Sequence, residues 1–548
     1  MPTTITWKPV LDMVKPRPIS SATLFGNPTF ASDAYAAYDM RGRDYANPIT
    51  YIMNTATEVY SYNNKADGWM QTPTGTIIGA GTGGIGKIFQ MAPSQGPKGT
   101  LTTGNTTTKV VISTALPASV AVNQLSNRGD GKGFIIRIIG SAAGSSGKIE
   151  ERRIIGNTSG TTPTLWLDEA LSFTPASGDS YELLTGRIYA MGTGSTAAGA
   201  FRYYDIATQS MSGNLSTTNM PSLVATNNNQ CVCLDEAYVP KNRLPGEGFI
   251  IGAATYDANS ATYVKGCLTA NATAAGTITG QSSAGDSSVL ANEYRNFQIR
   301  IVEDTTTPTA VGQRRRITSH TAGTSAVYTL ASNWTVTPSS TAKFVIENDN
   351  DKMIVWNQLA TPTYNYNHTA NTWDTTTWAA RTTGHSMGPA YQNFGIERDT
   401  TNNSRHSEIH SFRSGLTLDI FDIAGSATGS WTNGVTVANA GIAFSASLGL
   451  SNVSTFARNP FSGDGSQIII RSGSTSAVNG LIYAYHMKSR VIKSVTAEPL
   501  PADQINARTS MYSTGWGFSY YDNGTYVPAV YLNRAGSGVT IYQYLLLD

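Results

Sequence analysis

The chain has 548 residues, 40% of them hydrophobic, which is enough for several folded domains and excludes a disordered protein. Only 14% of the residues are charged, while Gly, Thr, Ser, Ala and Asn are abundant, so the composition is typical of short strands and turns. The formal net charge of +2 argues against a strongly basic nucleic-acid-binding protein.

The segment from Met1 to Pro9 lacks the apolar region of a signal peptide, and no run of about 18 apolar residues occurs in the chain. We therefore expect a protein that is made in the cytoplasm and does not insert into a membrane. Cys231, Cys233 and Cys267 are too few for a disulfide framework and lack the second ligand pair of a zinc site. We interpret them as small buried or half-buried residues.

Two short motifs in the first third of the chain have known meanings in other contexts. The glycines of 79–87 satisfy a GxGxxG pattern and end in Lys87, but no helix is predicted after them that could bind a phosphate. Arg128-Gly129-Asp130 spells a cell-adhesion tripeptide inside a Gly-rich loop. We interpret the first as a hairpin tip and the second as a turn.

A stretch that begins at Phe134 returns at Phe297 with a constant offset of 163 residues, which indicates an internal duplication. The starts of the two copies also match, since Lys98-Gly99-Thr100 corresponds to Lys265-Gly266-Cys267. Alternating apolar residues within each copy predict a compact β barrel or sandwich. We call the copies module 1 (99–186) and module 2 (265–351).

Outside the modules, a second pattern occurs six times: an aromatic residue on an alternating strand, then Asp or Asn in a turn, then often Trp. It predicts a strand, an Asx-type turn and a return strand whose Trp packs beside the next sheet. The residues that we expect in these cores are Tyr62, Trp69, Tyr204, Asp205, Tyr366, Trp373, Phe421, Trp431, Tyr485 and Tyr544.

The spacing of this second pattern is typical of four-stranded propeller blades, whose repeats are about 50 residues long. The Tyr-x-Tyr-Asp and downstream Trp resemble the kelch type of blade, which implies an all-β fold with about six blades, five to seven being possible. The modules then fall in loops of two successive blades. The predicted order is propeller 1–98, module 1, propeller 187–264, module 2 and propeller 352–548.

One group of residues in the last third of the chain could bind a metal. His406, Glu408 and His410 alternate along one predicted strand, and two imidazoles with a carboxylate could bind a divalent cation. However, neighbours on one strand face are about 7 Å apart, which is too far for three ligands to converge without a bulge. We interpret the segment as a solvated strand face, with a metal site as the alternative.

Other charged groups give no catalytic set. The acidic run 347–351 lacks the glycine and the terminal Glu of an EF-hand loop, so we interpret it as a linker. Arg314 and Arg316 share a strand face, and we expect them to stabilise module 2. No general acid pair, nucleophile triad or cofactor fingerprint follows from the spacing, so we expect no enzyme and no cofactor.

Taken together, the β-rich composition, the duplicated modules and the degenerate propeller motif resemble virion structural proteins of tailed bacteriophages. The segments 127–134, 156–162 and 171–179 are similar in style to small β modules that decorate such proteins. Over the blades, the chain resembles propeller-bearing tail hub or nozzle proteins of short-tailed phages. That resemblance implies a homo-oligomeric ring around the DNA exit channel, contacts with portal, tail or fibre proteins, and transient contact with genomic DNA.

Two alternatives remain open at this point. One is a peripheral capsid or tail appendage whose Tyr and Trp side chains bind a host glycan. The other is a propeller enzyme that degrades a polysaccharide. For a structural role we expect the protein in the virion, after synthesis in the host cytoplasm.

Overall fold

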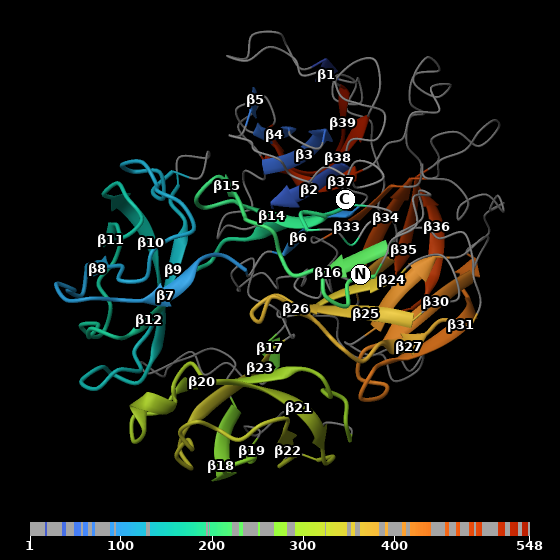
Figure 1. The fold of residues 1–548 in the computed structure, drawn as a ribbon. Helices are drawn as coiled ribbons and strands as arrows, with labels where there is room; N and C mark the ends of the chain where they lie inside the picture. Colours follow the sequence, from blue (N-terminus) through green and yellow to red (C-terminus); the bar gives the residue numbers. More distant parts are fainter. Residues whose placement is uncertain are drawn as a thin grey trace.

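The computed structural model is all-β, which confirms the predicted class: strands and turns make up the described residues, together with one short 3-10 helix, η1 (Pro308–Ala310) (Figure 1). The structure describes residues 17–18, 35–39, 49–55, 58–63, 68–71, 88–92, 95–127, 132–192, 196, 198–221, 230–233, 250–251, 268–281, 291–323, 325–347, 352–356, 362–382, 390–392, 408–412, 417–439, 455–459, 467–471, 482–486, 489–495, 513–520, 526–534 and 540–545.

Six sheets share one plan, a run of four antiparallel strands. Sheet A contains β2 (Tyr35–Asp39), β3 (Ile49–Thr55), β4 (Glu58–Asn63) and β5 (Gly68–Gln71). Sheet B contains β6 (Ile88–Ala92), β13 (Arg187–Met191), β14 (Phe201–Asp205) and β15 (Ser210–Met211). Sheet C contains β16 (Gln230–Cys233), β24 (Lys352–Trp356), β25 (Pro362–Asn367) and β26 (Thr372–Trp373), and β27 (Trp378–Ala380) also pairs with β25.

The remaining three sheets follow in the same way. Sheet D contains β28 (Ala390–Gln392), β29 (Glu408–Phe412), β30 (Thr417–Asp422) and β31 (Ser430–Thr436). Sheet E contains β33 (Thr455–Asn459), β34 (Gln467–Arg471), β35 (Ile482–His486) and β36 (Val491–Val495), with β32 (Ala438–Asn439) parallel to β36. Sheet F contains β37 (Ser513–Tyr520), β38 (Tyr526–Arg534), β39 (Thr540–Leu545) and β1 (Arg17–Pro18).

The first strands of these sheets connect one sheet to another. Strand β6 contacts both β2 and β16, β16 contacts β28, and β37 contacts both β33 and β2. Sheet F takes its outer strand from the other end of the chain, since Arg17 pairs with Ile541 (Figure 1).

Module 1 lies between the first two strands of sheet B, and its strands form a single sheet. In sheet order these are β7 (Lys98–Thr100), β12 (Ser180–Leu183), β9 (Ile135–Ile139), β10 (Ile149–Asn157), β11 (Thr164–Leu167) and β8 (Lys109–Val111). An isolated bridge between Leu101 and Ile112 joins the ends of β7 and β8, so the pairings run in a closed cycle.

Module 2 lies between the first two strands of sheet C and has the same cyclic strand order. Its strands are β18 (Leu268–Ala274), β23 (Lys343–Glu347), β20 (Gln298–Glu303), β21 (Arg314–His320), β22 (Val327–Leu330) and β19 (Thr277–Gln281). A further strand, β17 (Ile250–Ile251), pairs with β23 and adds to this sheet, although it precedes residue 265.

The cores follow from strand alternation and continue from the modules into the sheets. In module 1, Ile136, Ile138, Ile154 and Leu165 are fully buried, and the same apolar cluster includes Tyr204 of sheet B. The cluster of module 2 extends in the same way to Phe421 and other residues of sheets C and D. Each module therefore packs against the sheets and is not attached to them through its chain ends alone.

Candidate functional site

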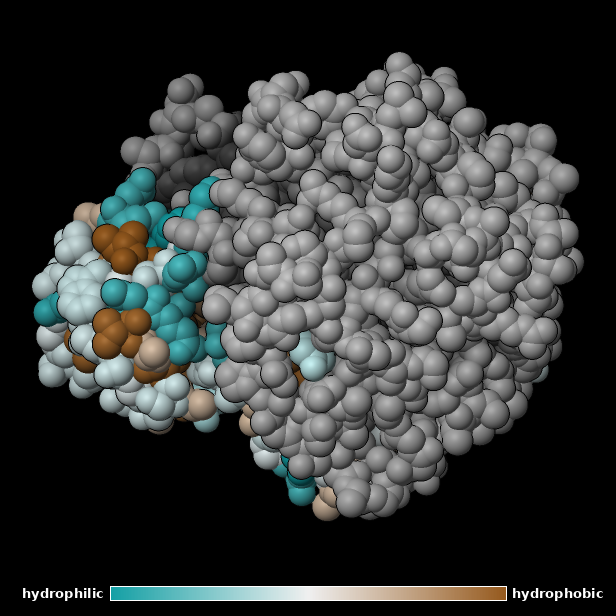
Figure 2. All heavy atoms as spheres, turned by 90° about the horizontal axis from the view of Figure 1, so that it is seen from above, coloured by the Kyte–Doolittle hydropathy of each residue, from teal (hydrophilic) through white to brown (hydrophobic). Residues whose placement is uncertain are grey.

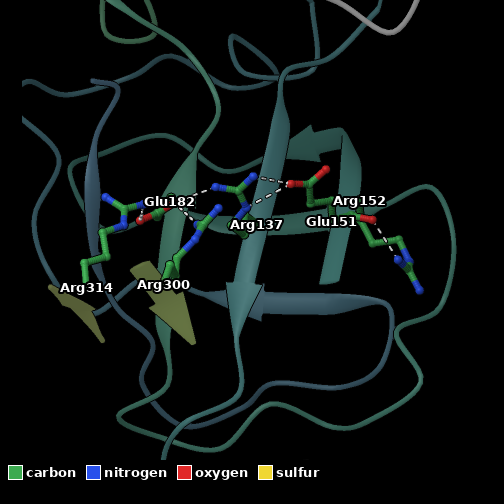
Figure 3. A network of polar contacts seen from close by, with 6 residues as sticks. All are labelled: Arg137, Glu151, Arg152, Glu182, Arg300 and Arg314. Carbon is green, nitrogen blue, oxygen red and sulfur yellow. Dashed lines mark hydrogen bonds and ion pairs between the residues drawn. The ribbon is translucent and has the colours of Figure 1, made fainter. Parts of the chain in front are cut away.

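The two modules meet at a buried cluster of charged side chains. The strand pairing within module 1 places the first three of them next to one another. Arg137 on β9 pairs directly with Glu151 on β10 and with Glu182 on β12, so it lies between two carboxylates. Arg137 Nη2 is 2.6 Å from Glu151 Oε1, and Arg137 Nη1 is 3.0 Å from Glu182 Oε2 (Figure 3). Within module 1 this arginine is charge-balanced by its own neighbours.

Module 2 has the opposite arrangement at the equivalent positions. Arg300 is the copy of Arg137 at the offset of 163, but its partners across the sheet are Arg314, where module 1 has Glu151, and Val345, where module 1 has Glu182. Two arginines thus lie side by side on β20 and β21 without an acidic residue on the adjacent strand positions. This pair would repel itself if the module stood alone.

Glu182 of module 1 supplies the missing negative charge. Arg314 Nη2 is 3.0 Å from Glu182 Oε1, and Arg300 Nη1 is 3.5 Å from Glu182 Oε2, so one carboxylate faces arginines from both modules (Figure 3). Burial by itself raises the pKa of Glu182, but Arg314, Lys98, Arg137 and Arg300 outweigh it and hold that pKa well below its ordinary value. The Glu182 carboxylate is therefore ionised at neutral pH.

Backbone contacts beside the cluster fix the same junction. Lys148 and Glu303 form an isolated β bridge between the modules, and Asp304 N donates a hydrogen bond of 2.9 Å to Gly147 O. Gly147 has a φ of +66°, and a Cβ there would come within 2.5 Å of Asp304 O, so only glycine fits. Ile139 of module 1 belongs to the apolar core of module 2.

Each module also has a loop that is held by one side chain at equivalent positions. Asn157 Oδ1 accepts from Leu125 N at 2.8 Å in module 1, and His320 Nε2 accepts from Tyr294 N at 2.9 Å in module 2. Burial lowers the pKa of His320, the Thr321 carbonyl opposes this shift and Arg295 adds to it, so the ring is neutral at pH 7.

These loops contact the turns that follow the third strands of sheets B and D. Gln124 Nε2 donates to Ala207 O at 3.0 Å, and Asn296 Nδ2 donates to Ile423 O at 2.8 Å and to Ser426 O at 3.0 Å. The turns themselves are Asx turns, as predicted, since Asp205 Oδ1 accepts from Thr208 N and Asp422 Oδ1 accepts from Ala424 N.

The aromatic residues singled out in the sequence occupy the third strands of all six sheets, and the tryptophans occupy the fourth. Tyr62 pairs with Trp69, Tyr366 with Trp373 and Phe421 with Trp431. The side chains of Tyr204, Asp205, Tyr366, Trp373, Phe421 and Tyr485 are buried, whereas those of Tyr62, Trp69 and Tyr544 lie outside the described side chains.

The tryptophans pack against the sheet that precedes them in the chain, not the next one. Trp373 of sheet C lies 5.5 Å from Phe201 of sheet B, and its Nε1 donates to Ser216 O. Trp431 of sheet D lies 5.6 Å from Trp356 of sheet C. A fourth strand therefore covers the sheet behind it.

The predicted solvated face at Glu408 and His410 is wrong, because both side chains are buried where sheet D meets sheet E. His410 Nε2 is 2.9 Å from Glu408 Oε2, and its Nδ1 is 2.9 Å from the Tyr485 hydroxyl. Arg490 also lies 3.3 Å from Glu408. Both ring nitrogens are used, so the pair joins two sheets and offers no position to a cation.

The metal alternative receives no other support. His406 lies outside the described residues, and those residues contain no group of three or more His, Cys, Asp or Glu that could hold a metal ion. The glycine motif at 79–87, the tripeptide 128–130, Cys267 and most of the acidic run 347–351 also lie outside the described residues. Cys231 and Cys233 are on β16, with side chains outside the description.

Sequence reasoning placed Arg314 in a stabilising role but missed its partner Glu182. A usable signal was present, since at the offset of 163 the acidic Glu151 becomes the basic Arg314. Reversed charge at equivalent positions of two copies indicates that the copies contact each other.

No helix among the described residues is long and apolar enough to cross a membrane.

Comparison with known proteins assigns no family to this chain. No protein-family model matches it, and no curated protein matches it. A solved structure entitled "Crystal Structure of Mitotic Checkpoint Complex" aligns over 95% of this chain and 93% of its own, with 8% identity and a TM-score of 0.28. An auxiliary nutrient binding protein from Bacteroides thetaiotaomicron aligns over 75% of this chain and 91% of its own, with 8% identity and a TM-score of 0.21. Both scores are too low to support a shared fold.

Proposed function

We propose that sheets A to F are the six blades of a kelch-like β-propeller from which the two modules project. The observation that supports this proposal is the repeated plan of four antiparallel strands, with the aromatic motif on the third strand of every sheet. The contacts between first strands and the pairing of β1 with β39 fit the closure of such a ring.

On this fold the protein is a structural component of a tailed-phage virion, and its best place is a hub or nozzle ring around the DNA exit channel. The buried ionic groups support a mechanical role, because they join parts of the molecule. Glu182 joins the modules, the Glu408–His410 pair joins sheets D and E, and Arg381 after β27 pairs with Asp419 of sheet D. A net charge of +2 also suits a channel that DNA must pass without being trapped.

The proposed partners are further copies of this chain, arranged in a ring, and the portal, tail or fibre proteins beside them. Genomic DNA would touch the ring only in passing. Both modules lie beside the six sheets (Figure 1) and contact each other through Glu182 and Arg314, so we expect neighbouring subunits to bind there.

Gold-antibody labelling of intact particles, viewed by electron microscopy, tests this function. Label at the tail tip or collar supports the ring, and native mass spectrometry of the purified protein should then give one fixed copy number. Label scattered over the capsid or fibres replaces the ring by an appendage or adhesin. Absence of the protein from virions, by mass spectrometry of purified particles, contradicts a structural role altogether.

A further inference from the structure

We propose that the outer face of β10 and β11 in module 1 binds a saccharide through Trp166. Three of the four large apolar side chains that the described residues expose lie on module 1: Val122 is 64% exposed, Ile155 59% and Trp166 41%. Figure 2 views this module from above, and brown apolar atoms stand there among teal hydrophilic ones.

The three side chains are held in one place by the backbone. Trp166 pairs directly with Gly156, and a β-bulge between Ile154 and Gly156 turns Ile155 outward. Asn123 N donates to Asn157 O, and Asn157 Nδ2 donates to Ala121 O, which places the loop that carries Val122 beside the same strand. Val122, Ile155 and Trp166 are called the apolar face below.

Gly156 leaves room for the indole of Trp166 beside the backbone of β10. A Cβ at Gly156 would come within 3.3 Å of Trp166 Cε3, and the glycine itself is buried. Cε3 of the indole therefore lies close to the backbone of Gly156, and Trp166 as a residue remains 41% exposed. The exposed part of an aromatic ring can stack on another planar or nearly planar group.

The fold does not require this apolar face, because module 2 is built without it. The same bulge occurs between Ile317 and Ser319, but it turns out Thr318 where module 1 has Ile155. Ser319 pairs with Thr329 where Gly156 pairs with Trp166, and Ala291 stands where Val122 does. A closed sheet of the same strand order thus forms with Thr318, Ser319, Thr329 and the small Ala291 at these positions, so this strand order does not require the exposed apolar side chains of module 1.

Size and chemistry favour a saccharide over a protein surface. The apolar face exposes roughly 300 Å² on ordinary side-chain areas, against about 800 Å² per partner in a stable protein complex. Lys109 pairs with Trp166 on its other side and offers an ammonium donor. Asn123 uses its Oδ1 to accept from Asn157 N and is exposed, which leaves its amide donors directed to solvent. The C–H face of a pyranose can stack on the indole while its hydroxyls accept from these donors.

Saturation-transfer NMR on the full chain tests the proposal with hexasaccharides of glucose and of N-acetylglucosamine and with a hexapeptide rich in leucine. Binding near the millimolar range is expected for at least one saccharide, and Trp166→Ala should weaken it about tenfold. Because part of the indole packs beside Gly156, the melting temperature of Trp166→Ala should fall by a few degrees while unfolding remains cooperative, which shows that the variant is folded. In the Trp166→Ala chain, the triple change Thr318→Ile, Ser319→Gly and Thr329→Trp should restore binding by building the face on module 2.

Val327→Ala, which removes the exposed apolar side chain of module 2, is the matched control and should leave the saccharide signal intact. Saccharide signals that persist in Trp166→Ala would overturn the proposal. So would the absence of any saccharide signal from the unaltered chain. Binding of the peptide alone, lost in Trp166→Ala, would assign the apolar face to a protein partner instead.

Discussion

The two modules have the same strand order but opposite electrostatic needs, and the difference explains how they are joined. In module 1, Arg137 lies between Glu151 and Glu182, while in module 2 the equivalent Arg300 lies between Arg314 and Val345. Duplication provided two similar folds, and the change of an acid to a base made one copy dependent on the other. The two equivalent modules therefore form one fixed unit whose halves differ in charge at these positions.

The largest effect is expected from Glu182→Gln, which leaves arginines from both modules beside a neutral amide. Removing one member of a buried ionic group costs about 3–5 kcal/mol, because the remaining charges lose part of their compensation while they stay buried. Chemical denaturation of the full chain should register this loss. Glu151→Gln is the control, since Glu151 contacts Arg137 within module 1 and its side chain is 16% exposed.

A second change can restore what Glu182→Gln removes. Arg314→Glu places an acid in module 2 at the position of Glu151, so that Arg300 gains a partner on the adjacent strand. The double variant should be more stable than Glu182→Gln alone. If Arg314→Glu lowers stability equally in both backgrounds, the two residues do not act on each other and the explanation above is incorrect.

His320 and Asn157 hold the equivalent loops and should give the stability of the two modules a different dependence on pH. The pKa of His320 is lowered on folding, so its contribution to stability is complete above the unfolded value near 6.5 and is lost as the pH falls through the folded pKa. Asn157 does not titrate. His320→Asn should therefore remove part of the loss of stability that sets in below about pH 6.5 in thermal melts, whereas an unchanged pH profile would place that loss elsewhere.

Glu182 also makes stability fall as the pH falls, but in a lower pH range than His320. Its folded pKa is also depressed, so its contribution is present above the unfolded value of about 4.3 and is lost as the pH falls further. In Glu182→Gln, melts recorded below pH 4.5 should depend less on pH than those of the unaltered chain.

The contacts between modules and sheets should give the smallest differences. Asn296→Gly keeps the backbone conformation, which has a φ of +69°, and removes the donor to two carbonyls of sheet D. We expect a loss of about 1–3 kcal/mol, because buried acceptors remain unpaired. Gln124→Ala removes two less buried bonds, the donor to Ala207 O and the acceptor of Ala121 N, and should cost about 1 kcal/mol or less. Denaturation that shows the larger loss for Gln124→Ala would reverse this ranking.

Strand alternation in the sequence was informative about which residues share a face, and much less so about what that face meets. It identified the aromatic positions of the third strands, but not the register that pairs Phe421 with Trp431. It could not tell that the face of Glu408 and His410 is covered by sheet E, because Tyr485 is far away in the sequence. Nor could it identify Gly147, whose importance arises from the close approach of Asp304.

The pairing of β1 with β39 also has a consequence for how the chain is made. Arg17 leaves the ribosome long before Ile541, its partner. Until β39 has been made, the strand edge that pairs with it is open to pairing with another chain. Contacts of such long sequence separation also form slowly. Crowded synthesis of many copies therefore carries a risk of strand exchange between neighbours, and peptides that mimic residues 17–18 with their flanks would compete for the place on β39.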